Sequence, residues 1–363
     1  MKSYDIIIIG AGPAGCAAAL SLKNTGLSVA LCEKAIFPRE KICGDGLCDR
    51  TLNTLKAISE SYYDELFAEL NPLAMQKAAL YYKNKKHVLH FKHFGYTVSR
   101  MDFDQFLFTR IKRDCPNVEI IENCRITRVQ RYEEAIEVFS KNISLQARFV
   151  IFANGAHTTI DDNFNRHQKS KDKSGFAIRA YYKGIQGLQE NCIEMHYKKQ
   201  YFPGYLWIFP MRNGLVNAGF GYHLKHAHQF DLPIKEIFAQ WINTDLKHRF
   251  MEAEQVSPLK GGLIAYSTNK YQCYGNNYVV AGDSASLVDP ISGGGIGNAM
   301  FSGREAALQA LRCFNHNDFS SKTTKIYASA LKKRMMREMT KQYLLQRTFS
   351  NHRWLMDIVA LFT

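Results

Sequence analysis

Two glycine-rich turns, one near each end of the chain, hold residue types that bind a dinucleotide. The first, Gly10-Ala11-Gly12-Pro13-Ala14-Gly15, has the spacing G-x-G-x-x-G. In this pattern the first glycine permits a tight turn, the second lets the backbone approach a pyrophosphate, and the third lets a helix pack closely on a strand. The phosphates then lie at the N-terminus of that helix, where free N–H groups favour negative charge.

The segments around this turn are those that the motif requires. Residues 4–9 are an apolar run with four consecutive isoleucines, which predicts a buried parallel strand. A helical stretch follows to Lys23, and a second apolar strand over residues 27–32 ends on Glu33. Glu33 is placed to accept hydrogen bonds from the ribose of an adenosine. The sequence therefore predicts dinucleotide binding, but this motif does not distinguish FAD from NAD(H).

The second turn decides between these cofactors. An apolar strand over residues 278–281 runs into Gly282-Asp283-Ser284-Ala285, and the glycine-rich residues 293–298 precede an alanine-rich helix. A second junction of this kind is not needed to hold a nicotinamide nucleotide, whereas FAD extends well beyond its ADP half. We expect Asp283 to accept hydrogen bonds from the ribityl hydroxyls, although alone it would be read as a turn or N-cap aspartate. We expect the N–H groups of residues 295–298 to face the pyrimidine edge of the flavin and to favour negative charge there.

The loop after the second strand carries further candidates. Cys43 is a candidate proton donor beside the flavin, although a free cysteine is most often a small buried apolar residue. Arg39 and Lys41 either neutralise the FAD pyrophosphate or are solvated loop cations. Asp45 is a candidate only through its place in the same loop.

The middle of the chain has the pattern of β-strands, with Asn213-Gly214 as a hairpin turn. Tyr205, Trp207 and Phe209 alternate, so they share one face of a strand. That face would form an apolar wall if it lies toward the flavin, and it would be ordinary packing if it lies toward the core. The sequence leaves both open.

The predicted fold is α/β: a Rossmann-like, three-layer FAD-binding domain with an inserted antiparallel-sheet substrate domain and a C-terminal helical tail. We assign residues 1–75, 98–173 and 271–319 to the FAD-binding domain, residues 76–97 and 174–270 to the substrate domain, and residues 320–363 to the helical tail.

These segments resemble the geranylgeranyl reductase family, within the flavoproteins that share the para-hydroxybenzoate hydroxylase fold. Besides the two glycine turns, the resemblance rests on Phe37 to Leu47, on Arg100 with Phe103-Asp104, on Ala153-Asn154-Gly155-Ala156-His157 and on Tyr205 to Pro210. It implies FAD, an elongated hydrophobic substrate and reduction of the isolated C=C bonds of isoprenoids. Relatives on this scaffold also carry out oxygen chemistry.

The resemblance also assigns roles to residues. It places Arg100 near the flavin and makes Tyr205 and Trp207 part of a substrate cavity. Asn154 replaces the family's usual aspartate, which puts the contact of that loop with the flavin tail or with NAD(P)H in doubt. Tyr205 also stands where tryptophan-type halogenases have the first tryptophan of W-x-W-x-I-P, which argues against halogenation.

The candidate residues form two sets. Those expected in catalysis are Cys43, Tyr205 and Trp207. Those expected to bind FAD are Gly10, Gly12, Pro13, Ala14, Gly15, Glu33, Lys34, Arg39, Lys41, Cys43, Gly44, Asp45, Gly46, Arg100, Asn154, Gly155, Gly282, Asp283, Pro290, Gly293, Gly294, Gly295, Ile296, Gly297 and Asn298.

The formal net charge of +14 limits the choice of partners. The chain has no nucleic-acid-binding motif, so a generally basic protein or one that meets an anionic membrane surface fits better. The residues after 320 have an amphipathic helical pattern, with Tyr327, Leu331, Met335, Met339 and Tyr343 four residues apart and cations between them. We expect this helix to pack on the domain with a solvated cationic face, and a helix resting on anionic lipid is the alternative.

Nine scattered cysteines without a C-x-x-C pair indicate neither a disulfide framework nor a zinc site. Glycines interrupt the apolar N-terminus, so a signal peptide is not expected, and we predict a cytoplasmic protein, with peripheral membrane contact as an option. With one G-x-G-x-x-G in the chain, the reductant is expected to be NAD(P)H that docks transiently or a separate electron carrier.

The function predicted from the sequence is FAD-dependent reduction of a C=C bond in an isoprenoid or polyene-like substrate. An FAD-dependent monooxygenase that hydroxylates or epoxidises an apolar or aromatic substrate is the alternative. A flavin-binding scaffold or sensor is the non-enzymatic alternative.

Overall fold

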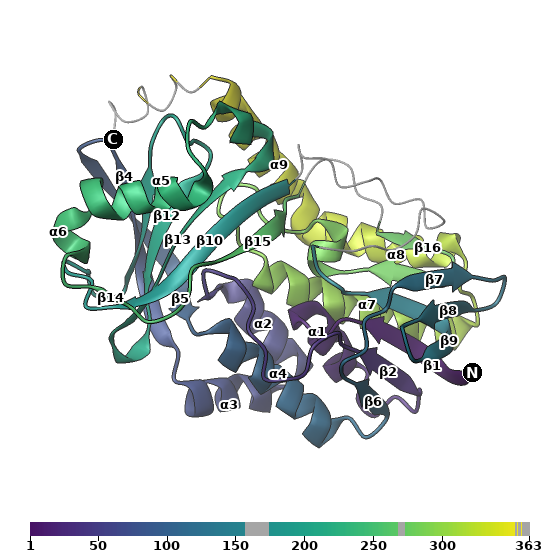
Figure 1. The fold of residues 1–363 in the computed structure, drawn as a ribbon. Coiled ribbons are helices and arrows are strands. Elements are labelled where there is room, and N and C mark those ends of the chain that lie inside the picture. Colours follow the sequence, from purple (N-terminus) through teal and green to yellow (C-terminus); the bar gives the residue numbers. More distant parts are fainter. Residues whose placement is uncertain (157–173, 268–272, 353, 355–356, 358–363) are drawn as a thin grey trace.

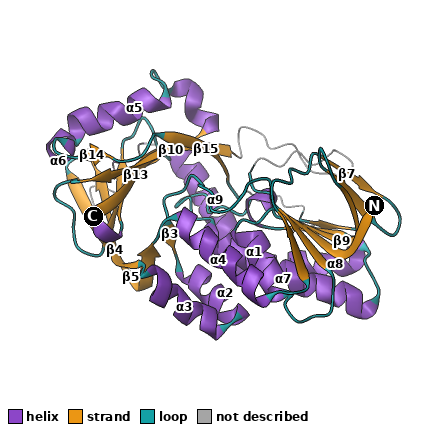
Figure 2. Cartoon of the chain, turned by 60° about the horizontal axis from the view of Figure 1, so that its bottom comes forward, coloured by secondary structure: helices purple, strands orange, loops and turns teal. Residues whose placement is uncertain are grey.

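The computed structural model describes residues 1–156, 174–267, 273–352, 354 and 357. The chain forms two β-sheets with a group of helices between them (Figures 1 and 2). One sheet is the mainly parallel sheet of a Rossmann-like domain and the other is mainly antiparallel, so the predicted fold class is confirmed. The domain boundaries given above stay a prediction.

The first sheet is built on the apolar run near the N-terminus. β1 (Lys2–Ile9) carries the four isoleucines, and none of them is more than 4% exposed. It pairs in parallel with β2 on one side and β9 on the other. A strand covered on both faces requires such a continuous apolar run. The other strands are β2 (Val29–Cys32), β6 (Val118–Ile121), β9 (Ser144–Phe152), β16 (Tyr274–Gly275) and β17 (Tyr278–Val280), with the antiparallel pair β7 (Arg128–Arg131) and β8 (Ile136–Phe139) joined to β9.

Helix α1 (Pro13–Ser21) follows the first glycine turn, and α7 (Ile296–His316) follows the second. The two helices pack together and touch at Gly303, where a Cβ atom would lie 2.0 Å from the carbonyl oxygen of Ala14. Only glycine permits so close an approach. The starts of the two helices are therefore held in one part of the molecule.

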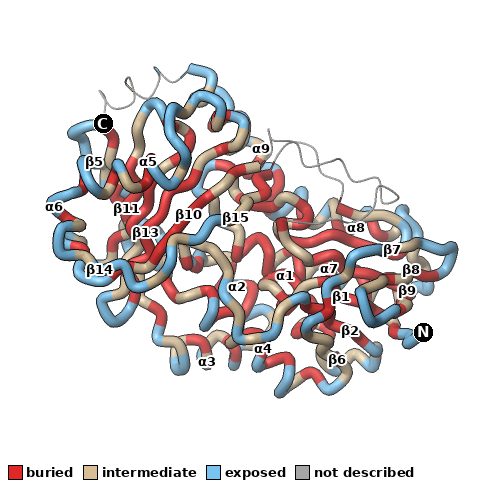
Figure 3. The backbone as a smooth tube through the Cα atoms, viewed as in Figure 1, coloured by how far each residue is buried: buried red, intermediate tan, exposed pale blue. Residues whose placement is uncertain are grey.

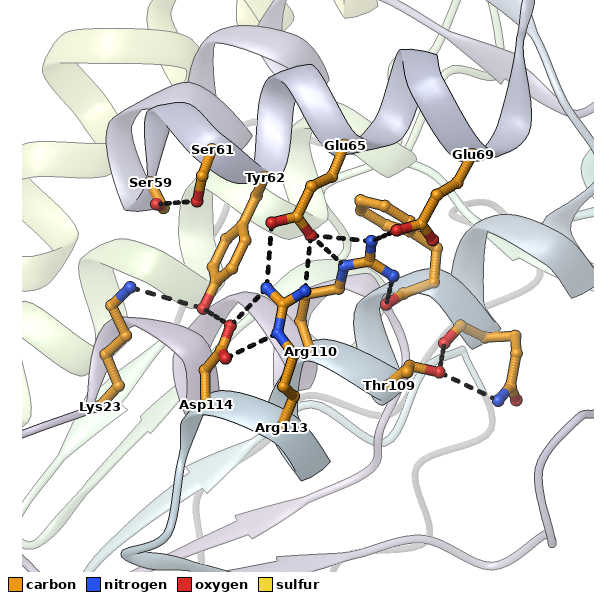
Figure 4. Close-up of polar contacts among 12 residues, drawn as sticks. Lys23, Ser59, Ser61, Tyr62, Glu65, Glu69, Thr109, Arg110, Arg113 and Asp114 are labelled. Atoms are coloured by element: carbon orange, nitrogen blue, oxygen red, sulfur yellow. Dashed lines mark hydrogen bonds and ion pairs between the residues drawn. The ribbon is translucent and has the colours of Figure 1, made fainter.

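Helices α2 (Asp49–Ile58), α3 (Glu60–Leu70) and α4 (Arg100–Asp114) complete this helical layer. Ion pairs join α3 to α4, as Figure 4 shows: the buried Arg110 donates from Nε to Glu65 at 2.9 Å and also pairs with Glu69. The hydroxyl of Tyr62 donates to Asp114 at 2.7 Å. These contacts fix α4, whose first turn reaches the site described below.

Side chains along the strands of the second sheet alternate between its two faces. Its strands are β3 (Gly46–Leu47), β4 (Leu73–Tyr82), β5 (Lys85–Thr97), β10 (Ser174–Lys183), β11 (Cys192–Tyr197), β12 (Tyr205–Pro210), β13 (Leu215–His223), β14 (Glu254–Gln255) and β15 (Lys260–Ala265). One face packs Ile178, Leu206 and Phe220 against α5 (Ile234–Gln240). The residues between them, such as Trp207 and Gly219, point the other way. Figure 3 shows that buried residues gather in central strands such as β1 and β13 and in helix α1, whereas β5 is mostly exposed.

The second sheet is not wholly antiparallel, because β4 and β11 pair in parallel. The chain returns to the first sheet between β5 and β10, so β11 reaches β4 without a hairpin connection and can run in the same direction. Short helical segments connect the strands: Arg212–Gly214, Leu224–Gln229, Trp241–Asp245, α6 (Lys247–Phe250) and Gly282–Ala285.

The C-terminal tail is helical: α8 (Ser321–Leu331), a π-helical turn (Lys332–Met336) and α9 (Arg337–Asn351) follow one another. Tyr327, Leu331, Met335 and Met339 are at most 2% exposed and belong to the core of the first domain. The four-residue recurrence is thus a packing face from Tyr327 to Met339, and its last member, Tyr343, is only partly buried. No helix among the described residues is both long and apolar enough to cross a bilayer.

Candidate active site

A cavity of about 500 Å³ is lined by both glycine turns, by the loop after β2 and by strands β12, β13 and β15 of the second sheet. Almost all the residues predicted from the sequence line it. The exceptions are Gly15, Asp45, Gly297 and Asn298. His157 lies outside the described residues.

The first glycine turn has room for a ligand at one position only. A Cβ atom on Gly12 would meet nothing closer than an Arg39 nitrogen at 3.9 Å, so the space above its backbone belongs to the cavity. A Cβ atom on Gly15 would lie 1.8 Å from the Gly10 carbonyl oxygen, which is the close packing of helix on strand that the motif predicts. Helix α1 begins at Pro13 without a side-chain cap, so its first N–H groups suit a phosphate.

Glu33 ends β2 and is only 4% exposed. Its Oε2 accepts a hydrogen bond from the Ala11 N–H at 2.8 Å, and its Oε1 accepts one from the Ala35 N–H at 3.1 Å. The carboxylate is therefore fixed beside the turn. Cys32, Cys124 and residues 125–127 line the same end of the cavity and were missed from the sequence. The adjacency of β2 and β6 could have indicated them, because parallel strands end at the same sheet edge.

Arg39 and Arg100 share one buried carboxylate. Asp104 pairs with Arg39 at 3.0 Å and accepts two hydrogen bonds from Arg100, at 2.7 and 2.8 Å. The Asp104 side chain is fully buried and that of Arg39 is 14% exposed. Arg39 is thus not a solvated loop cation; its role toward the pyrophosphate stays a prediction. Lys34 and Lys41 also line the cavity, and burial lowers the pKa of Lys34.

The second glycine segment contributes Gly282, Asp283, Pro290 and residues 293–296 to the cavity. Helix α7 begins at Ile296 without a side-chain cap, so a second set of helical N–H groups starts at the cavity. Asn154 and Gly155 approach this segment, since the Ser284 hydroxyl donates to the Asn154 side chain at 3.0 Å.

Gly297 and Asn298 instead pack within the helical layer. A Cβ atom on Gly297 would lie 2.8 Å from the Cys48 sulfur, and the Asn298 amide donates to the Leu287 carbonyl at 2.8 Å. Two uncapped helix starts, an open glycine and a fixed acid in one cavity suit a dinucleotide whose far end reaches the second turn. The residues present fit FAD.

The aromatic face of β12 lies toward the cavity, which answers the question that the sequence left open. Tyr205, Trp207 and Phe209 line it, whereas Leu206 and Ile208 are buried in the core of the second domain. The Trp207 ring covers Gly219 on the neighbouring strand, where a Cβ atom would lie 2.3 Å from the indole. Tyr205 donates a hydrogen bond to the Ser292 carbonyl in the second glycine segment.

Cys43 and Asp45 have different positions. Cys43 lines the cavity, and burial raises the pKa of its thiol, opposed by the charge of Arg100. Asp45 is fully buried behind the lining, and burial raises its pKa as well. A thiol with a raised pKa is protonated at neutral pH and is suited to give a proton.

His223 and Tyr266 also line the cavity and were not predicted. Their rings stack at 4.0 Å. Burial lowers the pKa of His223 to about 3, so it is neutral at physiological pH. Its Nε2 lies 3.1 Å from the Gln346 amide nitrogen, which connects α9 to the cavity. Alternation along β13 from Gly219 is the signal that could have indicated His223.

Comparison with known proteins gives a family match over most of the chain. The sequence model of a family described as "FAD binding domain" matches residues 3–309. This match confirms FAD as the cofactor.

A menaquinone reductase of Mycobacterium tuberculosis is 26% identical, covering 84% of this chain and 76% of the relative. A digeranylgeranylglycerophospholipid reductase of Thermoplasma acidophilum is also 26% identical, covering 95% of this chain and 87% of the relative. Among solved structures, a geranylgeranyl bacteriochlorophyll reductase-like protein of T. acidophilum has a TM-score of 0.84 at 21% identity, covering 96% of this chain and 88% of that one.

The two glycines of the first turn give a test of FAD binding. Gly12→Val fills ligand space without touching the fold, so we expect a folded protein whose FAD affinity falls at least about tenfold, or about 1.4 kcal/mol. Gly15→Val meets the Gly10 carbonyl, so we expect it to lower the melting temperature whether FAD is present or not. Flavin absorbance per chain and thermal melting of both variants measure this. A Gly12→Val protein with full flavin content would contradict the placement.

Proposed function

Because the chain belongs to the FAD-binding domain family, we propose that it is an oxidoreductase that reduces a C=C bond in an isoprenoid or polyene-like lipid. When reduced, FAD would supply the hydride for such a reaction. The observation that carries the proposal is the composition of the cavity, which joins a dinucleotide-binding end to an aromatic wall with a thiol between them. The names of two relatives support it, since both denote reductases of compounds with isoprenoid chains.

The aromatic residues of β12 that line the cavity would bind the substrate. Tyr205, Trp207 and Phe209 present a continuous apolar surface that binds a hydrocarbon chain and excludes water from the reacting bond. The Tyr205 and Trp207 rings meet edge to face with centroids 6.2 Å apart, and the Trp207 and Phe209 rings are tilted with centroids 6.4 Å apart. Such a wall selects for a flat or elongated apolar group rather than for a polar one.

The reduction needs a proton as well as a hydride. Cys43 is the candidate, since its thiol lines the cavity and its raised pKa keeps it protonated at neutral pH. The N–H groups at the start of α7 favour negative charge at the other side of the cavity. The hydride and the proton would then reach the substrate from two different partners.

The electron donor is part of the proposal. The sequence has one G-x-G-x-x-G, and the cavity already uses it for FAD. We therefore propose that NAD(P)H docks transiently or that a separate carrier delivers electrons.

Oxygen dependence tests the reaction class. Dithionite-reduced holoprotein mixed without oxygen with a lipid bearing a geranylgeranyl chain should return oxidised flavin and a product that has gained hydrogen, measured by absorbance and mass spectrometry. Product formed only in air and carrying label from ¹⁸O₂ would replace this proposal with the monooxygenase alternative.

Replacement of the thiol tests the proton donor. Cys43→Ala should keep FAD and lower the turnover rate by about 100-fold, the lower range for loss of a general acid. Cys48→Ala is the matched control, because Cys48 is exposed and does not line the cavity. Equal turnover of the Cys43→Ala protein and the control would rule the thiol out.

We also propose peripheral contact with an anionic bilayer through the end of α9. Leu344 and Leu345 are 50% and 52% exposed there, with the exposed cations Lys341 and Arg347 on the same helix. The buried side of this helix reaches the cavity through Gln346 and His223. A lipophilic substrate would then have a short path from the bilayer.

Vesicle binding tests this contact. Replacing Leu344 and Leu345 by Asp should weaken binding to phosphatidylglycerol vesicles by about tenfold, since two apolar side chains no longer enter the interface. Leu308→Asp on α7 is the control, because Leu308 is 37% exposed and lies on another helix. Equal sedimentation of both variants with the vesicles would contradict the contact.

A further inference from the structure

A single buried side chain connects the aromatic wall to the loop that carries the thiol. Asn217 lies on β13 and is fully buried. Its Oδ1 accepts a hydrogen bond from the Trp207 indole N–H at 2.8 Å. Its Nδ2 donates to the Cys43 carbonyl at 2.8 Å and to the Asp45 carboxylate at 2.7 Å.

The chemistry of this position requires an amide. One acceptor and two N–H donors on the same planar group are needed, and among side chains of this size only asparagine supplies them. A carboxylate has no donor, and a leucine of similar size has neither donor nor acceptor. The identity of residue 217 is therefore set by its three partners and not by packing alone.

Asp45 fixes the loop from behind. Its backbone has a φ of +63°, and its carboxylate also accepts a hydrogen bond from the Tyr181 hydroxyl at 2.6 Å and from the Arg100 N–H at 3.1 Å. These partners come from β10 and from the first turn of α4. The loop thus cannot move relative to the second sheet without breaking buried hydrogen bonds, each of which is costly to leave unmade.

The loop and the wall also meet without a gap. A Cβ atom on Gly44 would lie 3.2 Å from the Phe209 ring and 3.7 Å from the Trp207 nitrogen. Trp207 in turn covers Gly219. The distance between the Cys43 backbone and the wall is therefore set by this contact and by the Asn217 amide.

We propose that Asn217 is a positioning residue that fixes the position of the Cys43 thiol relative to the Trp207 ring. It thereby fixes where the reacting bond of the substrate lies. This inference rests on the proposed function, in which Cys43 gives the proton. Asn217 does not line the cavity and need not touch substrate. It acts through the two residues that it connects, Cys43 and Trp207. A small displacement of a reacting group lowers the rate of the reaction more than it weakens substrate binding.

Two substitutions separate positioning from simple packing. Asn217→Leu removes all three hydrogen bonds at every pH. Asn217→Asp keeps the acceptor for Trp207 but sets a second carboxyl against Asp45, and the contact between like charges makes ionisation of both carboxyls unfavourable. The pKa of the pair rises, so the introduced carboxyl is protonated at lower pH and can again donate to Asp45.

The pair formed by Asp45 and residue 217 lies next to Tyr181 and Cys43. The charges of Arg100 and Arg179 are nearby. In the FAD-loaded protein we expect both substitutions to lower kcat at pH 8 by about 10- to 100-fold, with KM changed less. As the pH falls to 6, Asn217→Asp should recover relative to the wild type, and Asn217→Leu should not. Asn142→Asp, on an exposed turn, is the charge control and should behave as the wild type.

A second readout does not depend on the substrate. The rate at which iodoacetamide alkylates Cys43, followed by mass spectrometry of its peptide, should change in both variants and return toward the wild-type rate at low pH only in Asn217→Asp. If the wild type reduces no isoprenoid, the proposed function fails while this readout still tests the positioning. If Asn217→Leu does not fold, Tyr181→Phe removes one bond to Asp45 and should lower kcat severalfold.

Two results would overturn the inference. One is a wild-type kcat and alkylation rate in both Asn217 variants. The other is an equal loss in both variants at every pH, which would mean that a donor regained at residue 217 does not restore the rate.

Discussion

The geometry of the site depends on one loop that is clamped between two domains. On the side of the first domain, the buried Asp104 carboxylate pairs with Arg39 of the loop and with Arg100 of α4. A carboxylate without exposure to solvent is tolerated only when its charge is compensated, so both arginines are held in place. On the other side, Glu40 pairs with Arg179 of β10, and Asp45 bonds to β10 and β13.

This clamp explains how one cavity serves two chemistries. Its dinucleotide end has helix starts and cations, which suit phosphates, and its other end has three aromatic rings and a neutral histidine, which suit hydrocarbon. Cys43 lies between the dinucleotide end and the aromatic end of the cavity, because its loop is bonded to both domains. The close contact of α1 with α7 at Gly303 keeps the two glycine turns at the distance that one cofactor can span.

The parts of this arrangement that local sequence determines were predictable, and the parts that depend on pairing were not. The isoleucines of β1 and the glycines at 10, 12 and 15 act through their immediate neighbours, so their pattern was sufficient. The orientation of Trp207 was open because a strand has two faces and the sequence does not say which one is covered. Asn217 and His223 were missed because their importance comes from the register of β13 against β12, which sets Gly219 opposite Trp207.

Other residues were assigned to the cavity on proximity in sequence alone. Gly297 and Asn298 follow the glycine run, but the turn of α7 points them at α2 and at the Leu287 carbonyl instead. Asp45 follows Cys43 by two residues and lies behind the lining, where it supports the loop. The role of Arg39 depended on Asp104, a partner distant in the chain that no local pattern identifies.

We expect one FAD to span both glycine turns and to present its ring to Cys43 and Trp207. The most direct measurement is a crystal structure of the protein purified with its flavin. We expect the ADP half at Gly12 and Glu33, and the isoalloxazine ring between the start of α7 and the Cys43 loop. A flavin bound elsewhere, or one whose ring points away from both Cys43 and Trp207, would contradict it.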